Sequence, residues 1–374
     1  MSDDPIINCH IHLFTERNIP TWMPNFFGAI LRHIGIRFGV LRFIVSFSFV
    51  RYILQNLGVQ DPRGWVTRLY AMRDIGRKSG PEAILNELQK YYPSDTKFVV
   101  LPMDMRYAKY GQVKEDIYEQ HRKLSELYKL QKYKDIIIPF ATFHPDRPDG
   151  VAEFRNCIEN YGFKGLKLYP KLGYRPDDPI LMNEIYPICI KHNIPVMSHC
   201  SSGGVKLKGW DQQQCDAVSR PQAFLKVLDE FNDLRVCLAH FGGAQAWDTY
   251  INDGIDPNDP ESRKDNFLAA LLDILETDDY PNLFTDISYT AFKISQNLPF
   301  LKVFLENDLV RSKTLFGSDY YMSRQEESSE RAVSVNLRVI LGETVFNEIS
   351  KANPARFLTG KLAKPTPPPN LLIS

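Results

Sequence analysis

Residues 6–13 read "IINCHIHL", a short apolar run that contains two histidines one residue apart. Side chains of a β-strand alternate between its two faces, so residues at i and i+2 point the same way. His10 and His12 would therefore share a face, where two neutral imidazoles can bind a divalent metal ion. The pair alone is a weak motif, because the chain holds eight histidines and a buried imidazole can equally serve as a hydrogen-bonding group.

Short apolar runs then alternate with longer amphipathic stretches, which is typical of repeated βα units. The further candidate strands are residues 98–105, 136–143, 165–170, 194–200, 235–241, 283–288 and 314–320. Candidate helices lie at 112–131, 150–161, 180–192, 220–232, 265–277, 294–307 and 325–340. With 6–13 there are eight strands, which favours an α/β fold of the (β/α)8 TIM-barrel type, in a distorted form, over an open doubly wound sheet.

The barrel is predicted to span residues 1–360, with a helical insertion at 15–95 and a Pro-rich tail at 361–374. Within the insertion, residues 25–58 are strongly apolar, but arginines leave at most eight residues between them, too few for a membrane span. Helical spacing of the apolar positions favours a buried helix or helix pair that covers a site or a subunit interface, with peripheral membrane contact as the alternative. We expect a homo-oligomer, formed through residues 15–95.

Composition excludes some classes of function. The 45 basic and 45 acidic residues balance, which gives no electrostatic reason to expect nucleic acid or an anionic membrane as the main partner. The six cysteines are scattered without a CxxC motif, and the first ten residues lack the features of a secretory signal. The sequence therefore predicts a reduced, cytoplasmic protein that acts on a small molecule.

Ionisable residues lie in or at the ends of the apolar runs, where an ionisable group is costly unless it is paired or binds a metal. They are His10, His12, Lys167, His199, His240 and Asp319. In a (β/α)8 barrel the carboxyl ends of the strands form the active site, so these side chains should meet there.

Three imidazoles and a carboxylate suit Zn²⁺, with Mn²⁺ or another divalent ion as alternatives. The predicted ligands are His10, His12, His199 and Asp319. A metal ion at this site would lower the pKa of bound water. Asp319 could also take the proton of that water, and His240 could act as a general acid or base.

Further residues that follow the strands are candidates for substrate binding or for support of the site. Arg106 follows the second strand and could bind a substrate carboxylate through paired hydrogen bonds. His144, Lys167 and Tyr169 are the other candidates. The turn "SSGG" at 201–204 could approach a ligand through its backbone or could be a simple turn.

Six segments in order, "NCHIH", "GFKGLKLYP", "PVMSHC", "CLAHFGG", "LFGSDY" and "ISKANPARFL", resemble the amidohydrolase superfamily. The resemblance is to its amidohydrolase-related group, which includes aminocarboxymuconate-semialdehyde decarboxylase and pyrone-dicarboxylate lactonase. It implies a distorted (β/α)8 barrel that usually holds one divalent metal ion. Carried over to this sequence, the ligands are His10, His12, His199 and Asp319, with His240 in the catalytic position.

Two positions bear on this resemblance. Members of the group commonly have an acidic residue two positions before the first histidine, where this chain has Asn8, so the role of that carboxylate is altered. Lys167 lies on the strand where binuclear relatives carry a carboxylated lysine that bridges two metal ions. In this group the lysine is more often unmodified, so we expect one metal ion.

The sequence is compatible with two catalytic hypotheses and one non-catalytic hypothesis. The leading hypothesis is a metal-dependent hydrolase of a C–O or C–N bond in a small carboxylate-bearing or cyclic substrate. The alternative is a non-oxidative decarboxylase that uses the same residues on an aryl or dienyl carboxylate. The third, a non-catalytic barrel protein, is disfavoured because a scaffold has no physical need for three converging histidines.

Overall fold

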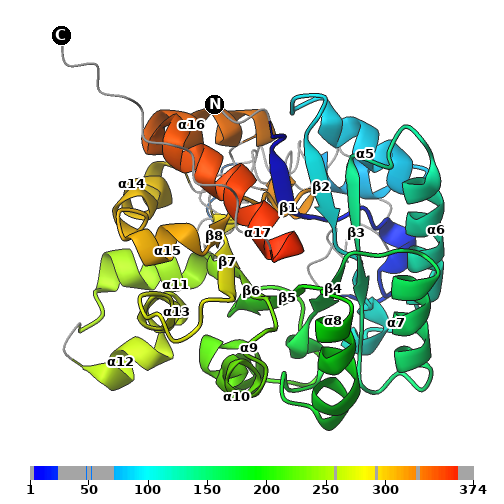
Figure 1. Ribbon diagram of the computed structural model, residues 1–374, viewed down its shortest axis with the longest axis horizontal. Helices are drawn as coiled ribbons and strands as arrows, with labels where there is room; N and C mark the ends of the chain where they lie inside the picture. The colour runs from blue at the N-terminus through cyan, green and yellow to red at the C-terminus, as the bar shows by residue number, and fades with distance from the viewer. Residues whose placement is uncertain are drawn as a thin grey trace.

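The computed structural model describes residues 4–23, 48, 52, 71–256, 259–290, 294–325 and 329–360. Within these residues eight parallel strands form one sheet in which each strand pairs with the next along the chain (Figure 1). The strands are β1 Ile7–Ile11, β2 Lys97–Val100, β3 Ile137–Thr142, β4 Gly165–Leu168, β5 Val196–Ser201, β6 Val236–Gly242, β7 Leu283–Asp286 and β8 Thr314–Leu315. Each strand overlaps its predicted run, with β2, β5 and β6 extending one residue beyond it, so the predicted (β/α)8 barrel is confirmed.

The barrel closes where β1 meets the residues that follow β8. The backbone amide of Cys9 donates to the carbonyl of Phe316 over 2.9 Å. Farther along, the amide of Asp319 donates to the carbonyl of His10 over 2.8 Å, and the amide of His12 donates to the carbonyl of Tyr320 over 2.5 Å. These bonds bring the "CHIH" segment directly beside the eighth-strand aspartate.

Helices connect successive strands and lie outside the barrel (Figure 1). The α-helices are α5 Pro81–Gln89, α6 Ile117–Lys129, α7 Gly150–Glu159, α8 Tyr186–Lys191, α9 Gln212–Ser219, α10 Leu225–Glu230, α11 Ala244–Asp248, α12 Pro260–Asp265, α13 Phe267–Leu275, α14 Ile294–Phe304, α15 Asp308–Ser312, α16 Glu330–Asn347 and α17 Asn353–Thr359. Short 3₁₀ segments include η1 Glu16–Asn18, η2 Met105–Ala108, η3 Pro170–Leu172, η5 Pro221–Phe224 and η8 Met322–Gln325. Single π-helical turns occur at η4 Leu181–Ile185, η6 Thr249–Asp253 and η9 Glu348–Ala352.

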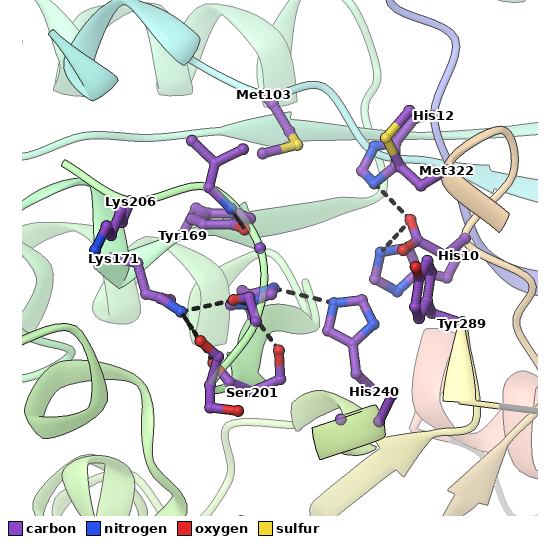
Figure 2. A pocket seen from close by; sticks show the side chains of 18 of the residues that line it. His10, His12, Met103, Tyr169, Lys171, Ser201, Lys206, His240, Tyr289 and Met322 are labelled. Carbon is purple, nitrogen blue, oxygen red and sulfur yellow. Dashed lines mark hydrogen bonds and ion pairs between the residues drawn. The ribbon is translucent and has the colours of Figure 1, made fainter. Parts of the chain in front are cut away.

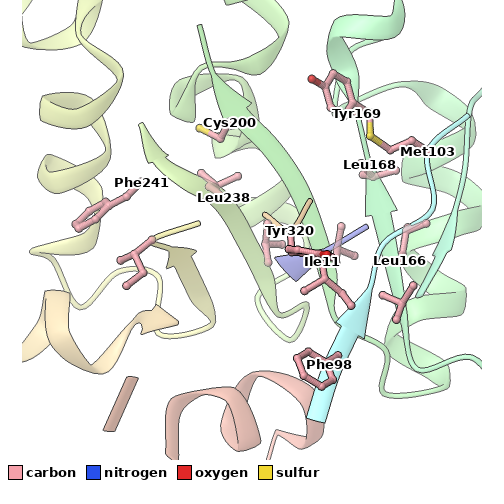
Figure 3. Packing of buried hydrophobic residues seen from close by; sticks show 14 of the residues in the cluster. Ile11, Phe98, Met103, Leu166, Leu168, Tyr169, Cys200, Leu238, Phe241 and Tyr320 are labelled. Carbon is pink, nitrogen blue, oxygen red and sulfur yellow. The ribbon is translucent and has the colours of Figure 1, made fainter. Parts of the chain in front are cut away.

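The strands are buried on both faces, as expected of a parallel sheet covered by helices, and this produces two apolar layers. The layer outside the barrel includes Ile11, Phe98, Leu166 and Leu238 (Figure 3). The layer inside the barrel consists of Ile7, Cys9, Val99, Leu101, Phe140, Met197, Cys237, Ala239, Phe284, Leu315 and Phe357.

Helix α17 covers the amino-terminal end of the barrel. The ring of Phe357 packs against Phe284 inside the barrel, with 5.3 Å between ring centroids. Arg235, which directly precedes β6, donates to the carbonyl of Phe357 over 2.6 Å, and Asn193 donates to the carbonyl of Thr359 over 3.0 Å. Any pocket formed by the strands is therefore restricted to their carboxyl ends.

The predicted insertion is described only in part. Its described portions, 15–23 and 71–95, contain η1 and α5. The apolar segment 25–58, apart from residues 48 and 52, and the tail 361–374 lie outside the described residues. None of the helices in the described part of the chain is both long enough and apolar enough to span a membrane.

Substitution of Gly165 by alanine tests the packing inside the barrel. A Cβ atom at this position would lie only 2.2–2.4 Å from the ring carbons of Phe140, so the ring would have to move. We expect Gly165→Ala to lower the free energy of unfolding by roughly 1–3 kcal/mol, measured by urea denaturation. The added substitution Phe140→Leu should recover part of the loss, because the two positions are in contact.

Gly80→Ala is the matched control, because a Cβ at Gly80 meets no atom within 4 Å. Gly80 is the N-cap of α5, where alanine is less favoured than glycine, so this variant should cost no more than about 1 kcal/mol. Equal destabilisation by Gly165→Ala and Gly80→Ala would contradict the close packing described here.

Candidate metal centre

A cavity of about 780 Å³ lies at the carboxyl ends of the strands (Figure 2). Seven of the nine side chains predicted to form the site line it, namely His10, His12, Lys167, Tyr169, His199, His240 and Asp319. The other two, Arg106 and His144, are not among the lining residues.

Three of these residues converge closely enough to share one metal ion. One ligand atom from each of His10, His12 and Asp319 lies within 4.8 Å of the others, and all three residues are buried. The carboxylate oxygen Oδ1 of Asp319 is 3.1 Å from Nε2 of His12 and 3.9 Å from Nε2 of His10. These residues come from β1 and from the segment after β8, which the closure of the barrel places side by side.

Hydrogen bonds on the far side of each ring fix the tautomers of the two histidines. Nδ1 of His12 donates to the carbonyl of Leu101 over 2.7 Å, and Nδ1 of His10 donates to Oδ2 of Asp286 over 2.8 Å. Burial lowers the pKa of His10 to about 3, so this imidazole is neutral near pH 7. Nε2 of His10 therefore presents a lone pair toward Asp319, as metal-binding imidazoles do.

The centre contains buried polar atoms that lack protein partners. Nε2 of His10, Oδ1 of Asp319 and Nζ of Lys167 have no hydrogen-bond partner among the described residues. A buried polar atom without a partner costs free energy, and lone pairs that face a carboxylate oxygen repel it. Two imidazole nitrogens and a carboxylate oxygen are suitable ligands for a divalent cation, so the residues present fit a metal ion.

Asp286, at the end of β7, supports this centre and was not singled out from the sequence. Its Oδ1 atom accepts from the backbone amides of His240 and Ser288, each over 3.0 Å. Burial alone would raise the pKa of Asp286, but His10, His240 and the Ser288 hydroxyl hold it far below its usual range. The sequence signal was present, since Asp286 follows an apolar run in the same way as the residues that were predicted.

His199 and His240 form a hydrogen-bonded pair across the cavity. Nε2 of His240 is 3.0 Å from Nδ1 of His199, and Nδ1 of His240 is 2.9 Å from the hydroxyl of Ser288. Burial lowers the pKa of both imidazoles, so both are neutral near pH 7. His199 was predicted as a metal ligand, but it is not in the group within 4.8 Å that contains His10 and His12.

The remaining predicted residues differ in their positions. Burial lowers the pKa of the Lys167 ammonium group to about 8. The ring of Tyr169 stacks on that of His199, with 4.3 Å between the ring centroids. Arg106 is exposed. The ring of His144 stacks on Tyr107 at 3.7 Å, outside the cavity lining.

A methionine-rich wall lines another part of the cavity. It consists of Met23, Met72, Met103, Met105 and Met322, five of the eight methionines in the chain. Between Met103 and Met105, the buried carboxylate of Asp104 accepts from Arg147 over 2.8 and 2.5 Å, which fixes this part of the wall. Sequence reasoning missed the wall, because the five residues are scattered over four segments without a local pattern.

His10 also belongs to a second group of possible ligands, with His240 and Asp286, and a third group, away from the cavity between α6 and α7, has a structural explanation. This third group contains His121, Glu153 and Cys157. Nε2 of His121 accepts from the backbone amide of Thr142 over 3.1 Å, so its proton is on Nδ1, which donates to Glu153 over 2.9 Å. Both ring nitrogens are thus engaged, and the group serves packing.

Comparison with solved structures supports the same fold. A 5-carboxyvanillate decarboxylase from Novosphingobium aromaticivorans, in complex with manganese and 4-hydroxy-3-methoxy-5-nitrobenzoic acid, has a TM-score of 0.56 and 13% identity, with 95% of this chain and 96% of that chain covered. A probable 2-pyrone-4,6-dicarboxylic acid hydrolase from Acinetobacter baumannii has a TM-score of 0.53 and 12% identity, with 95% and 99% covered. An uncharacterised TIM-barrel protein from Bordetella bronchiseptica has a TM-score of 0.53 and 17% identity, with 96% and 100% covered.

At these identities the likeness is one of fold. No curated protein matches the chain by sequence. A family model described as Amidohydrolase, however, matches residues 7–359, which is nearly the whole chain. The chain belongs to the amidohydrolase family.

Proposed function

We propose that this protein is a metal-dependent hydrolase that cleaves a C–O or C–N bond in a small, carboxylate-bearing or cyclic substrate. The observation that carries the proposal is the buried carboxylate of Asp319, whose Oδ1 atom lacks a hydrogen-bond partner and lies close to two imidazole nitrogens. This arrangement provides both ligands for a cation and a base beside it.

The residues that would hold the metal ion are His10, His12 and Asp319, with His199 retained as a fourth candidate. A divalent cation supplies a Lewis acid that polarises a substrate oxygen and lowers the pKa of water. Imidazole-rich sites suit zinc, which is our first choice, and the manganese in the structure of the decarboxylase makes Mn²⁺ the alternative.

Asp319 is placed to accept a proton from the attacking water. Burial alone would raise the pKa of Asp319, but the contact with His12 holds it below its usual value, so the carboxylate is ionised near pH 7. Its Oδ1 atom has no donor to compete with water for the lone pair. A positioned base of this kind contributes rate without moving far during the reaction.

His240 is placed to assist beside the proposed metal ligands, with 4.8 Å between the centroids of its ring and that of His10. It is neutral, and its ring is held by hydrogen bonds to Ser288 and His199. A neutral imidazole has one N–H group, which faces His199 in this structure; on turning to the substrate it could donate to an oxygen as negative charge develops on it, or protonate a leaving group. The methionine-rich wall makes part of the same cavity apolar, which would strengthen these interactions when a substrate fills it.

Non-oxidative decarboxylation is the second candidate, and the methionine-rich wall favours it. An apolar wall in the cavity of the proposed metal ligands would desolvate a bound carboxylate and so destabilise it relative to a transition state with dispersed charge. In that reaction His240 or Asp319 would deliver a proton to carbon as CO₂ leaves. The decarboxylases among the structural neighbours support this alternative.

Metal content gives the first test. We expect the purified protein to hold one equivalent of a divalent metal, mainly zinc, by elemental analysis. His12→Ala and Asp319→Ala should each reduce it to below about a tenth of an equivalent, because each removes a ligand. His144→Ala, which changes a buried histidine outside the cavity lining, should keep the metal. Two equivalents together with a carbamate on Lys167 would contradict a mononuclear centre.

Asp286→Asn tests the support of His10. The amide cannot accept the His10 Nδ1 proton with the strength of a carboxylate, so the orientation and basicity of the ring should suffer. We expect metal affinity to fall roughly 10- to 100-fold, measured by chelator competition. Asp273→Asn alters a surface ion pair with Arg263 and should leave the affinity unchanged.

The reaction itself is tested by mass spectrometry of metal-loaded protein incubated with aryl and dienyl carboxylates, lactones, esters and amides. We expect a product that has gained water, and a product that has lost CO₂ would replace the hydrolase with the decarboxylase. His240→Asn should lower kcat by roughly 100- to 10,000-fold with metal content unchanged. Full activity of this variant would remove His240 from the mechanism.

A further inference from the structure

Lys171, in η3, is a buried lysine whose donors are all directed at one backbone turn. Its side chain is almost fully buried, and Nζ donates to the carbonyls of Ser202 over 2.5 Å and Gly203 over 2.6 Å. The carbonyl of Ser201 lies 3.4 Å away (Figure 2). An ammonium group has three N–H donors, and these three carbonyls are enough to accept all of them. Lys171 is therefore not an anchor for a substrate carboxylate.

The turn at 201–204 lies directly against His199 and Tyr169. A Cβ atom at Gly204, where φ is +91°, would lie 2.2 Å from the hydroxyl of Tyr169 and 2.9 Å from Cε1 of His199. The next residue, Val205, donates its amide to the Tyr169 hydroxyl over 2.8 Å. Two successive glycines give this turn conformational freedom, which contacts with side chains must restrict.

The turn also determines which nitrogen of His199 carries the proton. Nε2 of His199 is 3.0 Å from the carbonyl of Gly203, and a carbonyl can only accept a hydrogen bond. The proton of the neutral ring is therefore on Nε2, and the hydroxyl of Ser201, 3.1 Å away, is a second contact of the same atom. Nδ1 then bears a lone pair, and it faces Nε2 of His240 over 3.0 Å.

Three carbonyl dipoles that point at one place repel one another unless a positive charge lies between them. Lys171 supplies that charge, and the carbonyl of Gly203 is shared between its ammonium group and the N–H of His199. If the ammonium group were lost, the turn would be free to rotate this carbonyl away from His199. The ring could then adopt the other tautomer, with its proton on Nδ1.

We propose that Lys171 is a positioning residue that holds the carbonyl of Gly203 against His199, and so keeps the lone pair of Nδ1 directed into the site. The lone pair is then available to His240, as observed, or to the metal ion. Any effect of Lys171 on catalysis rests on the proposed function. The tautomer of His199, by contrast, can be measured without any reaction.

The experiment compares Lys171→Met with the wild-type protein, both metal-free and labelled with ¹⁵N-histidine. Long-range ¹H–¹⁵N spectra report the protonated nitrogen of each ring, and the His199 signals are identified by their loss in His199→Gln. The apparent dissociation constant for Zn²⁺, from chelator competition, is measured in parallel.

Lys313→Met is the matched control. Lys313 is also buried, and it donates to the backbone carbonyls of Leu275 and Thr277 over 3.1 and 2.7 Å, but it is not a lining residue of the cavity. It should reproduce the thermal destabilisation caused by loss of a buried lysine without affecting His199. Lys171→Gln, which keeps two N–H donors but not the charge, should give an intermediate result and replaces Lys171→Met if that variant does not fold.

We expect wild type and Lys313→Met to show the Nε2–H tautomer of His199. Lys171→Met should show a mixture of tautomers and a Zn²⁺ dissociation constant raised roughly 10-fold or more. A folded Lys171→Met or Lys171→Gln protein with the unchanged tautomer and unchanged zinc affinity would overturn the inference. Wild-type protein that turns over no substrate would count against the proposed function alone, because the tautomer would still decide the role of Lys171.

Discussion

The candidate site depends on the backbone hydrogen bonds between β1 and the residues that follow β8. They place the amide of Asp319 on the carbonyl of His10 and the amide of His12 on the carbonyl of Tyr320. With this register the two imidazoles and the carboxylate point into the same space. A different register would separate the ligands even if every strand formed, because one residue of slip turns each side chain to the other face.

Asn8 strengthens this closure through a buried network of hydrogen bonds. Its Oδ1 atom accepts from the backbone amides of His10 and Ser318, and its Nδ2 group donates to the hydroxyls of Ser318 and Tyr92. Tyr92 in turn donates over 2.6 Å to Glu330, a buried acid whose pKa burial raises to about 7. An ionised carboxylate at position 8 could not make the two donated bonds, so this network is specific to the amide.

The sequence was sufficient to predict the eight strands and to bring seven of the nine predicted residues to one cavity. It succeeded because each strand is a buried apolar run, and because a parallel barrel places all its carboxyl ends at one end. Arg106 and His144 also follow strands, but local loop conformation turns them away from the cavity, and that conformation has no sequence signature. Tertiary packing alone creates three further features, so the sequence pattern could not specify them. They are the hydrogen bonds of Asp286, the contacts of Lys171 and the methionine-rich wall.

The position of the ligands along the chain constrains when the centre can form during synthesis. His10 and His12 leave the ribosome well before Asp319 and the closing bonds to Tyr320, which come only after the other strands and their helices. Domains fold as units once their contacts are available, so a nascent chain displays the paired histidines long before Asp319 can join them. If the centre binds a metal ion as proposed, capture of that ion would be coupled to completion of the barrel.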